Sequence, residues 1–130
     1  MSVTITHTIS NGGIQYSGSK TLEPSDEVVS RGTFSVANGQ TDKALSIGGV
    51  DQSQLVAVWL LSNVAVTLET NSSSAADDTI ALVANVPYVW CTGDPDTCLI
   101  TADIASTIYA TNASGSTATI SMMFVQDGTP

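Results

Sequence analysis

The chain has 130 residues, of which 42% are hydrophobic and only 12% are charged, and its twelve acidic residues outnumber three basic ones for a net charge of −9. This length predicts one domain over residues 1–130 with a single buried core. DNA, RNA and anionic membranes are bound through clustered Lys and Arg, so the composition argues against nucleic-acid and membrane partners. A basic protein surface is compatible with this charge.

The first strands are predicted by alternating hydroxyl-bearing and apolar residues. Over residues 2–9, Ser and Thr alternate with a second set of residues: Val3, Ile5, His7 and Ile9. Period two is the spacing of a β-strand with two unlike faces. We therefore expect a strand here, with residues 1–12 as an N-terminal arm or edge strand, followed by a weaker strand at 13–19.

The next pair of strands is predicted by a turn signal. Residues 28–37 indicate a strand in which Gly32 marks a bulge or bend. Asn38-Gly39 follows, and both residues tolerate positive φ, which favours a two-residue hairpin turn. The sequence therefore predicts a β-hairpin that leads into a strand at 44–47.

The middle of the chain is more hydrophobic. Residues 55–61 (LVAVWLL) are apolar at every position, as expected for a strand that is covered on both sides or lies in an interface. This run is far shorter than the roughly 20 residues that span a bilayer. Ser62-Asn63 predicts a turn after it. Further strands are expected around residues 64–69, 80–82, 87–90, 99–100, 107–110 and 117–125.

The fold class follows from the number and spacing of these segments. The only helical stretch expected is a turn or two near residues 102–106. About eight to ten short strands separated by regular turns predict an all-β fold, an antiparallel β-sandwich of jelly-roll or Greek-key type.

His7 is the only histidine, so it cannot belong to a histidine metal cluster. A Ser-His-Asp triad is formally open to it, but no Gly-x-Ser-x-Gly motif accompanies it. His7 shares the apolar phase of its strand, which favours a structural role. We expect no catalytic residue and no enzymatic activity.

Acidic residues occur in small groups: Glu23, Asp26 and Glu27; Asp77 and Asp78; Asp94 and Asp96. Glycoside hydrolysis needs two carboxyl groups that face each other across a sugar, and adjacent acids in loops rarely meet this geometry. Calcium is a better candidate for the loop with Asp94 and Asp96, but this loop is too short for an EF-hand. The favoured reading is a turn whose aspartates bind backbone amides. We expect neither metal nor cofactor.

The stretch VWCTGDPDTC, residues 89–98, contains the only two cysteines, Cys91 and Cys98. Two cysteines and a distant histidine cannot supply the four ligands of structural zinc, and the redox motif Cys-x-x-Cys is absent. A disulfide and two free thiols both remain open. The bridge would stabilise the fold by roughly 2.5 kcal/mol and would form outside a reducing cytoplasm.

Residues 44–127 resemble small β-sandwich proteins of tailed-phage virions, the decoration or cement proteins of the capsid. The resemblance lies in the runs LVAVWLLSNVAVTLETNSSSAADDTIALVANVPYVW, LITADIASTIYATNAS and ATISMMFVQDG. Within them stand a Thr-Asn-Ser loop, a Pro-x-x-Trp strand (Pro87, Trp90) and a Tyr-x-Thr-Asn strand (Tyr109, Thr111, Asn112).

This resemblance implies a non-enzymatic protein on the outer surface of a phage head, where it bridges neighbouring major capsid proteins. Such proteins commonly act as homo-oligomers, so a dimer or trimer on the shell is expected. The N-terminus shows no secretion signal, which fits synthesis in a host cytoplasm before assembly into the virion. Two alternatives remain: a tail or receptor-binding β-domain of the virion, and a carbohydrate-binding module with an exposed Trp59 or Trp90.

Overall fold

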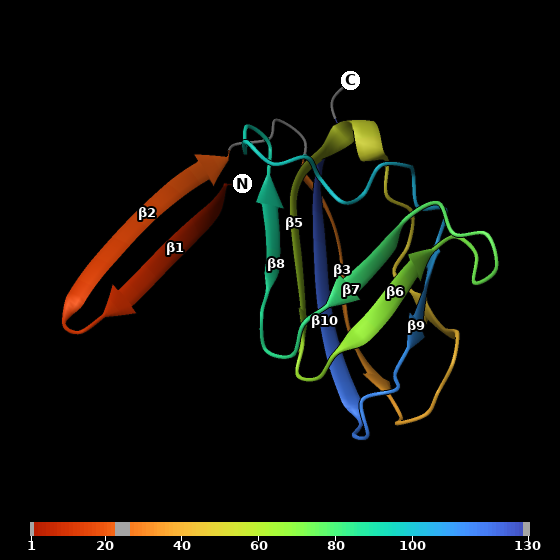
Figure 1. Ribbon diagram of the computed structural model, residues 1–130. Helices are drawn as coiled ribbons and strands as arrows, with labels where there is room; N and C mark the ends of the chain where they lie inside the picture. Colours follow the sequence, from red (N-terminus) through yellow and green to blue (C-terminus); the bar gives the residue numbers. More distant parts are fainter. Residues whose placement is uncertain (1, 23–26, 129–130) are drawn as a thin grey trace.

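The computed structural model describes residues 2–22 and 27–128 and is an all-β structure. Figure 1 shows a two-layered sandwich with one hairpin projecting from it. The strands are β1 (Val3–Asn11), β2 (Ile14–Leu22), β3 (Glu27–Val36), β4 (Lys43–Ser46), β5 (Leu55–Ser62), β6 (Val66–Thr70), β7 (Thr79–Leu82), β8 (Tyr88–Cys91), β9 (Thr107–Thr111) and β10 (Ala118–Asp127). The expected fold class is confirmed.

The sandwich has jelly-roll topology. Its strands pair from the outside of the sequence inward, β3 with β10, β4 with β9, β5 with β8 and β6 with β7, all antiparallel. Two further pairings, β10 with β5 and β9 with β6, join them into sheets of order β3-β10-β5-β8 and β4-β9-β6-β7. This nested pairing rolls one long hairpin into two packed sheets.

The core lies between the two sheets and is built by the period-two pattern of the strands. In β6, β7 and β9 every second residue is buried, and the intervening residues face outward. The largest fully buried side chains come from both sheets and the connection before β9: Phe124, Leu45, Leu60, Leu68, Ile100, Ile104, Ile108, Ile120 and Met122 among them. Burial of this apolar surface is the main term that stabilises the fold.

The strand β5 carries the apolar run expected from the sequence, and its register with β10 has a β-bulge. Val125 pairs with Ala57 and Gln126 with Leu55, which leaves Val56 as the extra residue on β5. A bulge lets two successive residues take the same side of a strand. Val56 and Ala57 accordingly both pack in an apolar cluster outside the main core.

The hairpin expected at Asn38-Gly39 is wrong, although Gly39 does take a positive φ of 80°. The strands on either side of this turn lie in different sheets. Asn38-Gly39 does form a turn, closed by the Gln40 N–H, which donates to the Ala37 carbonyl (3.2 Å), and the Gly39 N–H donates to the Asn112 carbonyl (2.7 Å). Val36 and Leu45 are both buried in the core between the sheets, so the strands before and after this turn do not pair. The chain therefore crosses from one layer to the other here.

Gly32 is not a bulge either. It pairs regularly with Met122 in the β3–β10 ladder. A Cβ atom at this position would lie 2.7 Å from the ring of Phe34, so the phenyl ring occupies the space above the glycine. The glycine is needed for this close approach, not for a bend.

Two further expectations about the connections are wrong. No strand forms at residues 99–100; the chain from 92 to 106 is irregular except for one bridge between Val50 and Ile104. The short helical turn lies at Gln52–Gln54 instead of residues 102–106. In the described part of the chain, no helix is long and apolar enough to cross a membrane.

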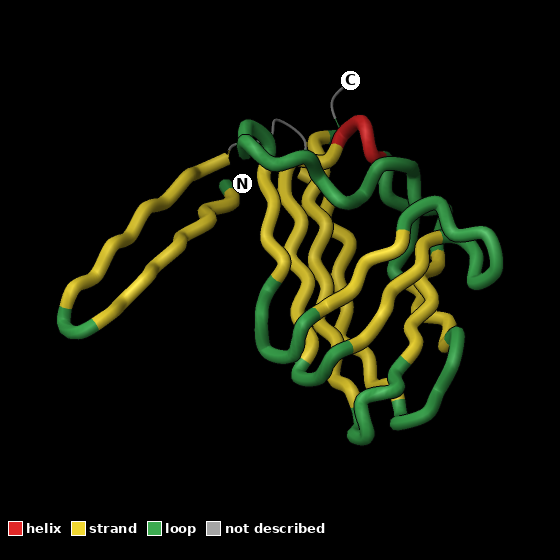
Figure 2. The backbone as a smooth tube through the Cα atoms, viewed as in Figure 1, coloured by secondary structure: helices red, strands yellow, loops and turns green. Residues whose placement is uncertain are grey.

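The strands β1 and β2 form a separate two-stranded hairpin. Figures 1 and 2 show that it leaves the sandwich near the end of β8 and that its turn lies well away from both sheets. The jelly roll thus carries an arm made of residues 3–22.

Candidate binding surface

The two sheets present very different outer faces. On the sheet β4-β9-β6-β7, the outward positions of β6 and β9 are mostly hydroxyl-bearing: Thr67, Glu69, Thr107, Tyr109 and Thr111. On the sheet β3-β10-β5-β8, Arg31 and Thr33 of β3 and Thr119 and Ser121 of β10 make one side of the outer face polar. The outward positions of β5, β8 and the second half of β10 are apolar: Ala57, Trp59, Leu61, Val89, Met123 and Val125. We call this apolar set the apolar outer face. Contiguous apolar patches on protein surfaces are often contact sites for other molecules.

The base of the hairpin covers one end of the apolar outer face. Val3 and Ile5 of β1 pack against a small buried cluster of Ala57, Cys91 and Val125. The ammonium group of Lys20 on β2 donates to the Thr92 carbonyl after β8. Among the described side chains of the arm, apolar packing of Val3 and Ile5 and the charged hydrogen bond of Lys20 attach it to the body.

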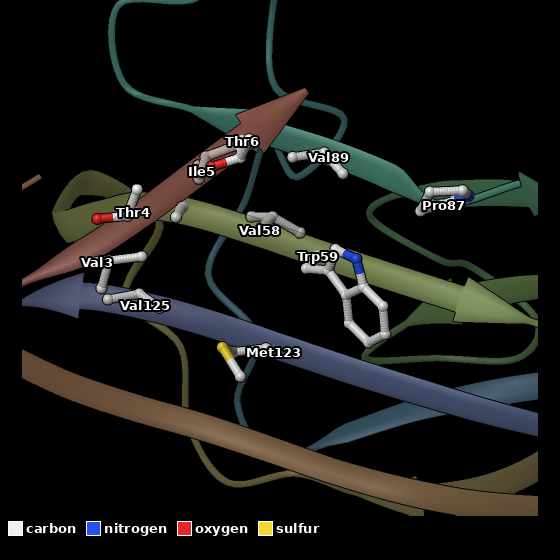
Figure 3. A pocket seen from close by; sticks show the side chains of 11 residues that line it. Val3, Thr4, Ile5, Thr6, Val58, Trp59, Pro87, Val89, Met123 and Val125 are labelled. Atoms are coloured by element: carbon white, nitrogen blue, oxygen red, sulfur yellow. The ribbon is translucent and has the colours of Figure 1, made fainter. Parts of the chain in front are cut away.

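A groove of about 490 Å³ runs between β1 and the sheet. Figure 3 shows Val3 and Ile5 above it and Trp59, Val89 and Met123 along its floor. The rest of its lining is Thr4, Thr6, Ala57, Val58, Pro87 and Val125.

A second groove of about 440 Å³ continues the first toward β3. It shares Trp59 and Met123 with the first groove and adds Arg31, Thr33 and Ser121. Trp59 and Met123 are directly opposite in the β5–β10 ladder, so their side chains form the boundary between the two hollows. Together the two grooves cross most of the apolar outer face, and the hairpin base roofs only one end.

Residues 89–98, the stretch with both cysteines, form the end of β8 and a tight acidic turn. The Cys91 N–H donates to a carboxylate oxygen of Asp94 (2.8 Å), and the Cys91 thiol lies 3.3 Å from the other oxygen. The indole N–H of Trp90 donates to the Asp96 carbonyl (3.1 Å), while its ring packs against the main core. The expected turn, in which aspartate binds backbone amides, is confirmed for Asp94.

Cys91 and Cys98 are both buried free thiols in the structure. Cys91 lies in the small cluster with Ala57 and Val125, and Cys98 lies in the core between the sheets. Burial raises the pKa of both thiols, and the Asp94 carboxylate raises that of Cys91 further. Neither thiol is prepared to act as a nucleophile.

Tyr88 links this stretch to the irregular connection that follows. Its hydroxyl accepts the Leu99 N–H (2.9 Å) and lies 4.0 Å from the Cys98 sulfur. Burial raises the pKa of the Tyr88 phenol to about 12. The tyrosine is an anchor for the chain after Cys98.

The adjacent acids Asp77 and Asp78 have separate structural roles. Asp78 is buried and accepts hydrogen bonds from the Thr101 N–H (2.9 Å), the Thr101 hydroxyl (2.5 Å) and the Ala102 N–H (3.4 Å). Asp77 is exposed and accepts from the Asn71 amide (2.6 Å). They do not face each other across a cleft, so they lack the geometry of a glycosidase pair.

The structure brings no catalytic set together in the part that it describes. His7 lies opposite Gly18 in the β1–β2 ladder, and its side chain is outside the described set, as are Glu23 and Asp26 entirely. Among the described residues, no group of three or more His, Cys, Asp or Glu side chains is placed to hold a metal.

A comparison with protein-family profiles found no match, and searches of curated proteins and of solved structures also found none.

Sequence reasoning did not locate the grooves, although one signal pointed to this strand. The uninterrupted apolar run at residues 55–61 indicated coverage on both sides or an interface. Met123 gave no such signal, because its place beside Trp59 depends on the register of strands more than 60 residues apart in the chain.

Proposed function

We propose that this chain is a non-enzymatic structural protein that decorates the outer surface of a tailed-phage head and bridges its major capsid proteins. The observation that carries the proposal is the contrast between the two sheets. One outer face is rich in threonine and suits solvent, whereas the other contains an apolar area that is grooved and only partly covered. A surface of this type attaches a protein to other protein chains.

The contents of the described chain support attachment over catalysis. The buried carboxylate of Asp78 accepts hydrogen bonds from Thr101 in the connection between β8 and β9. Both thiols are buried, and their pKa values are raised. The jelly-roll strand order agrees with the resemblance to capsid decoration proteins over residues 44–127. The net charge of −9 favours a partner surface that carries Lys and Arg.

The test is co-sedimentation with undecorated heads of the phage whose particles contain this chain. We expect the protein to pellet with the heads in a saturable manner and to raise the temperature at which they release DNA. The matched variants are Trp59→Asp on the apolar outer face and Tyr109→Asp on the threonine-rich face. Only Trp59→Asp should lose binding, by about tenfold or more. Protein that stays in the supernatant and leaves head stability unchanged would remove the proposal.

A carbohydrate-binding module is the second candidate, because Trp59 lies in a groove on a sheet face. Trp90 is not suited to this role, since its ring packs against the core and its N–H binds Asp96. Stacking of a sugar on Trp59 should change the tryptophan fluorescence. A response to a glycan that Trp59→Asp abolishes would favour this candidate over capsid decoration.

A further inference from the structure

One row of outward side chains crosses the whole sheet β3-β10-β5-β8. In the ladders, Val89 of β8 lies opposite Trp59 of β5, Trp59 lies opposite Met123 of β10, and Met123 lies opposite Arg31 of β3. Residues that pair directly in this way share a face of the sheet. Neighbouring strands are about 4.8 Å apart, so the row is roughly 14 Å long from Val89 to Arg31. Its apolar side chains end at a cation.

The two grooves lie along this row. The first groove holds the half with Val89 and Trp59, and Figure 3 shows Val3 and Ile5 of β1 above it. The second groove holds the half that ends at Arg31. The row therefore provides a continuous apolar floor that is roofed by the base of the hairpin at one end and meets a guanidinium group at the other.

The charge of the groove lining is opposite to the charge of the molecule. The chain carries twelve acidic and three basic residues, for a net charge of −9. Among the described residues that line the two grooves, none is acidic, and Arg31 is the only charged residue. Arg31 is exposed, so its guanidinium group is accessible to a ligand. Because guanidinium groups bind carboxylates through two parallel hydrogen bonds, the lining favours a ligand with a carboxylate at one end of an apolar body.

Hydrogen-bonding groups are scarce in the first groove. The polar side chains in its lining are Thr4, Thr6 and the indole of Trp59. The strands of its floor, β5 and β10, pair with a neighbour on both sides, so their backbone groups are used in the ladders. An extended peptide along the row would bury backbone N–H and C=O groups that lack partners, which costs free energy. An alkyl chain has no such groups, and each methylene that it buries favours binding.

We propose that the row from Val89 to Arg31 binds a medium-chain alkyl carboxylate, with its chain beneath the base of β1 and its carboxylate on the Arg31 guanidinium. The volume of the first groove, about 490 Å³, is typical of small-molecule sites. The inference goes beyond the proposed function, and the ligand would compete with a capsid protein for this surface. It is tested on the purified chain without heads, so its failure is separate from a failure to bind heads.

The first experiment measures the charge preference of the groove by isothermal titration calorimetry. The probes are dodecanoate, whose extended chain is about as long as the row, and dodecyltrimethylammonium, which has the same chain and the opposite charge. Both are used below the concentration at which they form micelles. We expect one dodecanoate per chain, bound about threefold to tenfold more tightly than the cation. Equal binding of the two probes, no binding of dodecanoate, or uptake of many molecules per chain would overturn the inference.

The second experiment locates the carboxylate. Arg31→Glu reverses the charge at the end of the row, and Lys43→Glu makes the same change at an exposed position of the other sheet. Arg31→Glu should prefer dodecyltrimethylammonium, because its carboxylate repels the carboxylate of dodecanoate. Lys43→Glu should keep the preference of the wild type. The same preference in both variants would contradict a carboxylate site at Arg31.

The third experiment locates the alkyl chain. Trp59→Asp places a charge in the floor of the groove, and Tyr109→Asp places the same charge on the outer face of the opposite sheet. We expect Trp59→Asp to bind dodecanoate at least about tenfold more weakly and Tyr109→Asp to bind it as the wild type does. Undiminished binding by Trp59→Asp would place the ligand elsewhere and overturn the inference.

Discussion

Individual buried polar groups hold the irregular part of this jelly roll in place. The buried side chains of Asp78 and Asn112 and the half-buried hydroxyl of Tyr88 form hydrogen bonds with backbone groups of loops and connections. Asn112 shows the pattern well: its amide donates to the carbonyls of Val36 (2.9 Å) and Ser116 (2.7 Å). Buried polar atoms must be paired in this way, because an unpaired one costs on the order of 1–3 kcal/mol.

Tyr88 makes the stability of the protein sensitive to alkaline pH. Burial raises the pKa of the Tyr88 phenol to about 12 in the folded state, compared with its ordinary value of 10.0. The folded protein therefore holds the phenol proton more tightly than the unfolded chain does, and this contribution to stability is lost as the pH rises from about 10 to about 12.

We expect the urea midpoint of the wild type to fall across this range, and to fall less steeply in Tyr88→Phe. The buried thiols also make the urea midpoint fall as the pH rises. The informative quantity is therefore the difference in urea midpoint between the wild type and Tyr88→Phe at each pH. If the urea midpoints of the two proteins fall equally steeply between about pH 10 and pH 12, the fold does not hold Tyr88 protonated.

At the scale of the elements, the sequence predicted the strands better than their partners. Period-two alternation located most of the strands, because it reflects a local property, the burial of every second side chain. Sheet membership is not local. Asn38-Gly39 has the chemistry of a hairpin, yet β3 and β4 belong to different layers because Val36 and Leu45 must both reach the core between the sheets.

The candidate surface also depends on strand partners, which the sequence does not reveal locally. The apolar run of β5 indicated an interface, but the grooves required knowing that Trp59 pairs with Met123 and that the hairpin base returns over Ala57. The connection after Cys98 was misjudged as a strand at residues 99–100 for a related reason. Ile100 is buried, but its neighbours are held by Tyr88 and Asp78 and not by a ladder.

The connection between β8 and β9 should depend strongly on Asp78. Asp78→Ala leaves the Thr101 and Ala102 amides without their acceptor, so we expect a loss of about 1–3 kcal/mol in the free energy of unfolding, measured by urea denaturation. Asp77→Ala is the matched control. That residue is exposed, and its removal should cost no more than about 0.5 kcal/mol. Equal effects of the two substitutions would contradict the role assigned to Asp78.

At the scale of the whole molecule, the two layers of the jelly roll differ in their outer faces. The sheet β4-β9-β6-β7 turns threonines outward, while the sheet β3-β10-β5-β8 has two grooves that meet at Trp59 and Met123. On a phage head, the first face would meet solvent and the second would meet neighbouring chains.

The central claim, the proposed place of this chain on a phage head, is tested most directly by a reconstruction of the virion. The account predicts sandwich-shaped density on the outer surface of the head, with the face around Trp59 and Met123 against protein neighbours and the face around Tyr109 toward solvent. Density confined to the tail, or a sandwich attached through the threonine-rich face with the Trp59 groove open to solvent, would contradict it.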